Sequence, residues 1–122
     1  EPSVLKMNSY YVIAVFNTEY IVYCYRDEET GAFLPEAKVM FNKETNSTII
    51  SLHVNEEYIV TFCKSNIMIE DVREGNMVYK FLETIPMSSL PTLVTLANEF
   101  LYIYDDSGTI FCFHLLEQSL VS

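Results

Sequence analysis

Tryptophan is absent from this sequence, and glycine is scarce, with three residues among 122. With four prolines, the chain must form most of its turns from Asn, Asp, Glu and Ser. No apolar stretch approaches the ~18 residues that span a bilayer, so membrane insertion is not expected. No signal-peptide pattern opens the chain. It begins with Glu1, which indicates a processed chain or a piece of a longer protein.

Positive charge is also scarce, because 7 Lys and Arg residues face 17 Asp and Glu residues. The formal net charge of −10 repels phosphate backbones, so nucleic-acid binding is not expected. An acidic surface keeps a protein in solution and attracts basic patches on partner proteins.

The motifs of common catalytic and cofactor sites are missing. There is no CxxC or HxxxH pair, no glycine-rich phosphate loop, no G-x-S-x-G and no H-E-x-x-H, so no metal, cofactor or enzymatic activity is expected. The cysteines are odd in number and lie in apolar runs, at Cys24, Cys63 and Cys112. They are predicted to be buried thiols of a cytoplasmic or nuclear protein.

Short runs of Val, Ile, Tyr, Phe and Thr dominate the chain and predict β-strands. Three hairpins recur. Residues 10–16 and 20–26 flank a turn at 17–19, residues 57–63 and 67–72 flank 64–66, and residues 100–104 and 109–115 flank 105–108. Further strands are predicted at 37–41, 48–54, 77–82 and 92–97, and a helical turn is considered at 115–120.

Four strands repeating every ~40–45 residues are typical of a β-propeller blade. The fold prediction is therefore all-β, with blades of four-stranded antiparallel sheets at about 4–42, 48–83 and 92–122. Only the middle blade is predicted to be complete. Strands such as 10–16 are apolar nearly throughout, which indicates burial on both faces between stacked blades.

The third strand and following turn of the middle copy, residues 67–81, resemble a WD40 repeat. Glu70-Asp71 stands where that family has Trp-Asp, and Tyr25-Arg26 and Phe113-His114 are aligned with it in the other copies. The family's Gly-His dipeptide is absent. The resemblance implies that Asp71 bonds across its turn and stabilises its blade.

Three blades cannot close a ring, since propellers have ~4–8. We therefore expect protein partners, or other parts of the polypeptide, to supply the missing blades. The turns predicted to contact partners contain Asn17, Lys64 and Asp105, with the loops at 42–46 and 85–90. Ile85, Met87 and Leu90 are apolar for a loop, and this predicts a protein contact.

Other polar groups have plain structural interpretations. The carboxylate clusters at 27–29 and 70–74 are predicted to be solvated turns rather than acid–base pairs or cation sites. Cys112 and His114 alternate on one strand, but a zinc site needs further ligands. His53 would approach Cys63 only if the hairpin pairs them.

The predicted function is a non-catalytic interaction scaffold in an intracellular complex, with substrate recognition in a ubiquitin ligase as one use of such propellers by analogy of fold. Two alternatives remain open. The chain is part of a propeller enzyme with its active site in the central channel, or it is a stand-alone β-sandwich binding domain.

Overall fold

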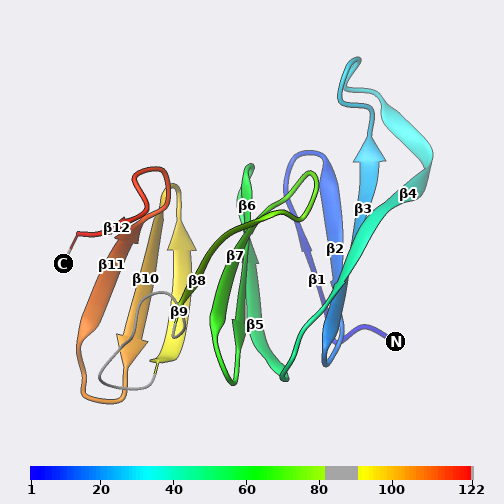
Figure 1. Ribbon diagram of the computed structural model, residues 1–122. Helices are drawn as coiled ribbons and strands as arrows, with labels where there is room; N and C mark the ends of the chain where they lie inside the picture. The colour runs from blue at the N-terminus through cyan, green and yellow to red at the C-terminus, as the bar shows by residue number, and fades with distance from the viewer. Residues whose placement is uncertain (82–90, 122) are drawn as a thin grey trace.

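A computed structural model describes residues 1–81 and 91–121 of the chain (Figure 1). Within these residues, twelve strands form three separate four-stranded antiparallel sheets, each built from strands consecutive in sequence. The first contains β1 (Val4–Met7), β2 (Tyr11–Val15), β3 (Glu19–Arg26) and β4 (Phe33–Glu44). The second contains β5 (Ile49–Val54), β6 (Tyr58–Cys63), β7 (Ile67–Asp71) and β8 (Met77–Phe81). The third contains β9 (Pro91–Ala97), β10 (Phe100–Asp105), β11 (Ile110–His114) and β12 (Ser119–Leu120).

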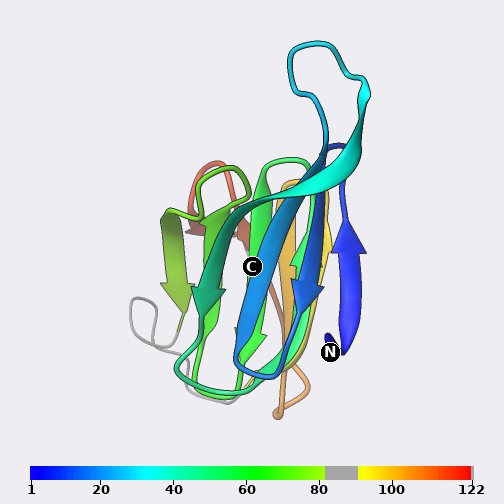
Figure 2. The same cartoon turned by 90° about the vertical axis from the view of Figure 1, so that its right-hand side faces the viewer.

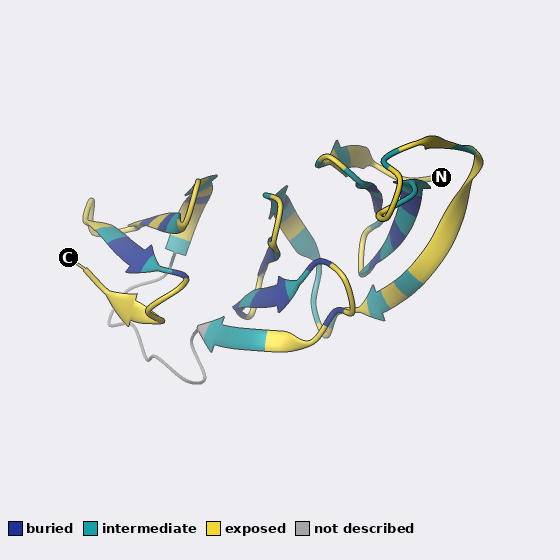
Figure 3. Cartoon of the chain, turned by 90° about the horizontal axis from the view of Figure 1, so that it is seen from above, coloured by how far each residue is buried: buried dark blue, intermediate teal, exposed yellow. Residues whose placement is uncertain are grey.

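The sheets stand side by side as blades of an open arc, as the view from above shows (Figure 3). The first strands of neighbouring blades touch, β1 against β5 and β5 against β9. The predicted all-β fold, with four-stranded blades in an incomplete ring, is confirmed. The β-sandwich alternative is wrong, because the chain forms three sheets in a row rather than two facing layers.

The first and third blades are more complete than predicted. Strand β4 begins at Phe33 and ends at Glu44, so it includes part of the predicted loop at 42–46. Its Pro35 is accommodated because β4 is an edge strand of its sheet. The helical turn considered at 115–120 is instead a tight turn followed by the short strand β12, which completes the third sheet.

Burial between neighbouring blades holds the arc together. A first cluster of buried apolar side chains joins the first two blades. It contains Ile13, Tyr20 and Val22 of the first blade and Leu52 and Ile59 of the second. Tyr20 and Ile59 are fully enclosed. Since apolar burial contributes about 25 cal/mol per Å², these junctions are the main source of stability between blades.

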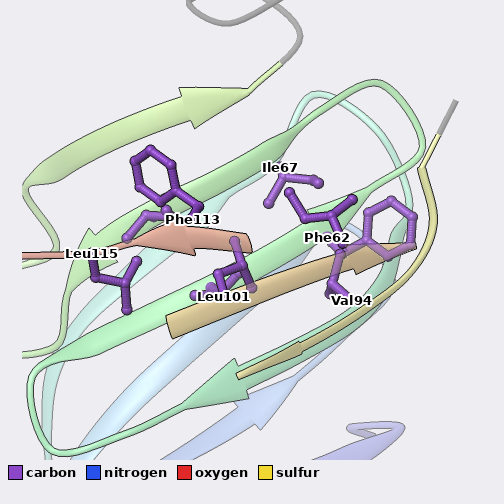
Figure 4. Packing of buried hydrophobic residues seen from close by; sticks show 9 residues of the cluster. Phe62, Ile67, Val94, Leu101, Phe113 and Leu115 are labelled. Carbon is purple, nitrogen blue, oxygen red and sulfur yellow. The ribbon is translucent and has the colours of Figure 1, made fainter. Parts of the chain in front are cut away.

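The second cluster joins the second and third blades in the same way (Figure 4). Phe62 and Ile67 of the second blade lie against Leu101, Phe113 and Leu115 of the third. Consecutive residues of β6 thus serve different junctions, with Ile59 in the first cluster and Val60 in the second. This two-sided burial explains why β6 is apolar almost throughout.

The two ends of the blades carry different turns. The β2–β3, β6–β7 and β10–β11 turns and the β4–β5 connection lie at the end drawn lowest in Figure 1, called the lower end here. The other hairpin turns lie at the upper end, and there the β3–β4 hairpin projects beyond the rest, as the side view also shows (Figures 1 and 2). Among the described residues there is no helix long and apolar enough to cross a membrane.

Candidate interaction surface

The lower end brings together two of the residues predicted to contact partners. The Ile49 N–H donates to the Asn17 carbonyl at 2.8 Å, and the Lys64 N–H donates to the Thr48 carbonyl at 3.0 Å. The Ser47 and Ser65 hydroxyls are 2.8 Å apart. Asn17 and Lys64 are both exposed, so their side chains form one lower loop surface with residues 45–48.

Asp105 lies at the same end, but its carboxylate turns inward. It is 1% exposed, and its Oδ1 accepts hydrogen bonds from the Ser107 and Thr109 N–H groups at 3.1 and 2.9 Å. A buried carboxylate that caps its own turn offers no atom to a partner, so the expected contact at Asp105 is corrected to a structural role. The neighbouring Asp106 is exposed.

The apolar loop prediction falls on a part of the chain that the structure leaves undescribed. Ile85, Met87 and Leu90 lie outside residues 1–81 and 91–121. Their proposed partner contact therefore stays a prediction.

Asp71 accepts hydrogen bonds across the β7–β8 turn, from the Glu74 N–H to Oδ1 at 2.7 Å and from the Asn76 N–H to Oδ2 at 2.8 Å. This is the cross-turn bonding that the WD40 resemblance implies for it. Asp27 caps the β3–β4 turn in a similar way, through the Glu29 and Thr30 N–H groups.

In the first blade, strand β3 continues three residues further before its turn than β7 does in the second blade. Tyr11 pairs with Cys24, whereas its counterpart Tyr58 pairs with Asp71. Strand register therefore matches Glu70-Asp71 with residues 23–24, and the alignment with Tyr25-Arg26 is wrong. The turn begins only at Asp27, so the β3–β4 hairpin projects from the upper end.

This projecting hairpin carries an ordered, exposed aromatic cluster that the sequence reading missed. Phe33 is 74% exposed, and its ring stacks on Tyr25 with centroids 6.1 Å apart. The Arg26 guanidinium lies 5.4 Å from the Phe33 ring centroid and 5.3 Å from that of Tyr10. Arg26 Nε also donates to the Gly31 carbonyl at 2.8 Å. The sequence feature that could have predicted this cluster is Arg26, which follows Tyr25 at the end of the long strand β3 and can pack on aromatic rings.

The 70–74 carboxylate cluster is only partly a solvated turn. Glu70 is 3% exposed, and the Tyr20 hydroxyl of the first blade donates to its Oε1 at 2.7 Å. The other oxygen, Oε2, lies 3.6 Å from Lys43 Nζ. The solvated role predicted for Glu70 is therefore wrong, because it is a buried polar link between two blades.

Burial makes two groups near Glu70, the Tyr20 hydroxyl and the Cys63 thiol, less acidic than usual. Burial, followed by the charge and the hydrogen bond of Glu70, raises the pKa of Tyr20 far above its usual value. Burial also raises the pKa of the Cys63 thiol. At Cys63 the raised pKa lowers the fraction of nucleophilic thiolate. All three cysteines are buried and form no disulfide, as predicted.

The two histidines occupy separate structural positions. His53 pairs with Val60, whereas Cys63 pairs with Ile49, so no Cys–His pair forms. Burial, with a smaller effect of Lys6, lowers the pKa of His53. His114 Nε2 lies 3.0 Å from Glu99 Oε1. Within residues 1–81 and 91–121, no group of three or more His, Cys, Asp or Glu side chains is arranged to hold a metal ion.

Comparisons with known proteins identify the fold and leave the function open. No protein-family model and no curated protein sequence matches the chain. The crystal structure of HIRA(644-1017) is similar over 96% of this chain, with a TM-score of 0.64 and 14% identity. Hsv2 of Kluyveromyces lactis is similar over 97%, with a TM-score of 0.59 and 12% identity.

A chain in the S. cerevisiae assembly of Dbp5 with Nup159, Gle1, IP6 and ADP is also similar, with a TM-score of 0.64, 11% identity and 98% of this chain covered. The matched region is 38%, 34% and 33% of the three solved chains, so this chain spans about a third of their length. The described residues have the fold of a partial β-propeller of about three blades.

Proposed function

We propose that the chain is a non-catalytic interaction scaffold, a propeller segment that binds other proteins in a cytoplasmic or nuclear complex. The observation that carries this proposal is the projecting β3–β4 hairpin with its exposed Phe33. Aromatic and arginine side chains are enriched where proteins bind one another, and side chains held in place before binding lose little entropy. Arg26 and Tyr25 hold Phe33 in this way.

The lower loop surface is the second contact region of the proposed scaffold. Asn17 and Lys64 are exposed on turns that the β4–β5 connection ties together. Loops that cluster at one end of a rigid β scaffold are common binding surfaces. Further propeller blades from another chain, whether a different protein or a second copy, are part of the same proposal, since three blades leave the ring open.

Affinity capture with matched baits tests the proposal. Wild-type chain and the Phe33→Ser and Lys64→Glu variants are immobilised, incubated with an extract of the source cells, and the retained proteins are identified by mass spectrometry. We expect Phe33→Ser to lose proteins that the wild type retains. Met77→Ser is the matched control, because Met77 occupies the corresponding exposed position at the start of β8, opposite Glu70 as Phe33 is opposite Arg26.

The outcome also separates the two surfaces. If only Lys64→Glu loses retained proteins, binding is assigned to the lower loop surface. If every bait retains the same proteins, the scaffold role of both the hairpin and the lower loop surface is contradicted. Ubiquitin-ligase subunits among the retained proteins would identify the substrate-recognition form of this function.

A further inference from the structure

The outward side of the third blade is an apolar surface that no sheet covers within residues 1–81 and 91–121. We call it the open face of the third blade, and it is formed by Leu93, Thr95, Tyr102, Tyr104 and Ile110. These residues line a shallow apolar depression of about 320 Å³. Leu93 is 67% exposed and Ile110 is 60% exposed.

Strand pairing shows that these positions form blade junctions elsewhere in the chain. The Tyr104–Ile110 pair beside the β10–β11 turn corresponds to the Phe62–Ile67 pair beside the β6–β7 turn. Phe62 and Ile67 are 3% and 0% exposed because the third blade covers them. The open face of the third blade is therefore the same junction surface without its cover.

The first blade exposes the opposite kind of surface. Its open face is formed by Leu5, Met7, Val12, Ala14, Ile21 and Tyr23, which share one side of the sheet by strand pairing. In the third blade, the β10 counterparts of Val12 and Ala14 are Leu101 and Ile103, and both are completely buried against the second blade. The residues that form the two open faces are uncharged. Glu19 and Glu44 lie on the same side of the first sheet at its lower end, next to Ile21 and Asn42.

We propose that two copies of this chain associate head to tail, with the open face of each third blade covered by the open face of the other copy's first blade. Each junction inside the chain joins these same two kinds of face, and the chain leaves one of each uncovered. A second copy supplies both. Two arcs of three blades give six, which lies within the ~4–8 blades of closed propellers, and head-to-tail contacts close when the rotation completes a ring.

A row of asparagine hydrogen bonds links the upper turns of neighbouring blades, and the proposed junction would continue it. Asn8 Nδ2 donates to the Asn55 carbonyl of the next blade at 2.9 Å, and Asn55 Nδ2 donates to the Asn98 carbonyl at 2.7 Å. Asn98 is exposed at the last turn of this series. In the dimer its side-chain amide faces the Asn8 carbonyl of the second copy.

Sedimentation equilibrium of the 122-residue chain tests this inference. The wild type is expected to sediment as a dimer across a concentration series. Ile110→Asp and Leu5→Asp each place a carboxylate on one open face, and each should raise the dimer dissociation constant by about tenfold or more. Met77→Asp, an exposed apolar position on the rim strand β8, is the control and should leave the dimer intact. Circular dichroism verifies that all variants are folded.

Mixing the variants distinguishes a head-to-tail contact from a symmetric one. A mixture of Ile110→Asp and Leu5→Asp retains one undamaged junction and should recover dimer, whereas either variant alone is monomeric. A monomeric wild type, a dimer that ignores both substitutions, or a mixture that stays monomeric would overturn the proposal. The result is independent of the scaffold proposal, because Phe33 and Lys64 lie on neither open face and the chain is measured alone.

Discussion

The side-chain amide of Asn8 links the first blade to the second by donating from Nδ2 to the Asn55 main-chain carbonyl at 2.9 Å. The Oδ1 atom of the same side chain accepts the Tyr10 and Tyr11 N–H groups at 3.0 and 2.8 Å. Asn55 repeats both functions, because it caps its own turn and donates to Asn98. One residue type thus shapes each turn and fastens it to the next blade.

Asn8→Ala is expected to lower the free energy of unfolding by about 1–3 kcal/mol, because it removes three hydrogen bonds that contribute about 0.5–1.5 kcal/mol each and partly compensate in water. Denaturation in urea, followed by tyrosine fluorescence, measures the change. Asn46→Ala is the control, since Asn46 is exposed in the β4–β5 connection. Equal stability of the two variants would contradict a role for the asparagine series.

Gly75 is required by two features of the β7–β8 turn. Its φ of 76° lies in the left-handed region, and a Cβ there would lie 2.6 Å from Phe41 Cε2 and 2.9 Å from Lys43 Cε of the neighbouring blade. Gly108 has a similar φ of 86°, but its nearest contact for a Cβ is 3.8 Å away. The two glycines therefore separate backbone strain from blade packing.

Gly75→Ala should destabilise the chain by about 1–3 kcal/mol more than Gly108→Ala, because overpacking at the blade junction adds to the shared strain of a positive φ. Thermal denaturation of both variants, with the wild type alongside, gives the difference. Equal losses would mean that Phe41 and Lys43 move aside without cost.

The sequence correctly predicted the features that depend on the local pattern of apolar and turn residues. The strand rhythm, the three central hairpins and the two-sided burial of β6 follow from apolar periodicity and turn residues, and each is present. Strand β12 escaped prediction because it is only two residues long. The projecting hairpin escaped because the extra residues of β3 continue the strand pattern.

Contacts between blades were beyond the reach of the sequence pattern. Glu70 follows an apolar strand and precedes a polar turn, so it reads as a solvated residue. Its partner Tyr20 is 50 positions away in the chain, and only the stacking of blades brings the two together. The burial of Asp105 was missed for a related reason, since a turn carboxylate can face either water or its own backbone.

The Tyr20–Glu70 hydrogen bond should show coupling in a double-mutant cycle. Tyr20→Phe leaves a buried carboxylate oxygen without its donor, and Glu70→Leu leaves a buried hydroxyl without its acceptor, so each should cost about 1–3 kcal/mol. The double variant loses both partners together and should cost less than the sum, with a coupling energy of about 1–3 kcal/mol. Tyr20→Phe combined with Glu74→Leu is the control, because the exposed Glu74 should add independently. Additivity in the first pair would show that the bond contributes nothing to the junction.

The raised pKa of Tyr20 predicts a loss of stability at alkaline pH. In the folded chain, burial and Glu70 keep the Tyr20 hydroxyl protonated well above pH 10, whereas in the unfolded chain it ionises with a pKa of about 10. Its contribution is therefore complete below pH 10 and decreases as the pH rises toward the folded-state value, by about 1.4 kcal/mol per pH unit for one site. Urea denaturation from pH 8 to 11 should show a steeper decline for the wild type than for Tyr20→Phe. Parallel pH profiles would show that Tyr20 ionises as readily in the folded chain as in the unfolded one.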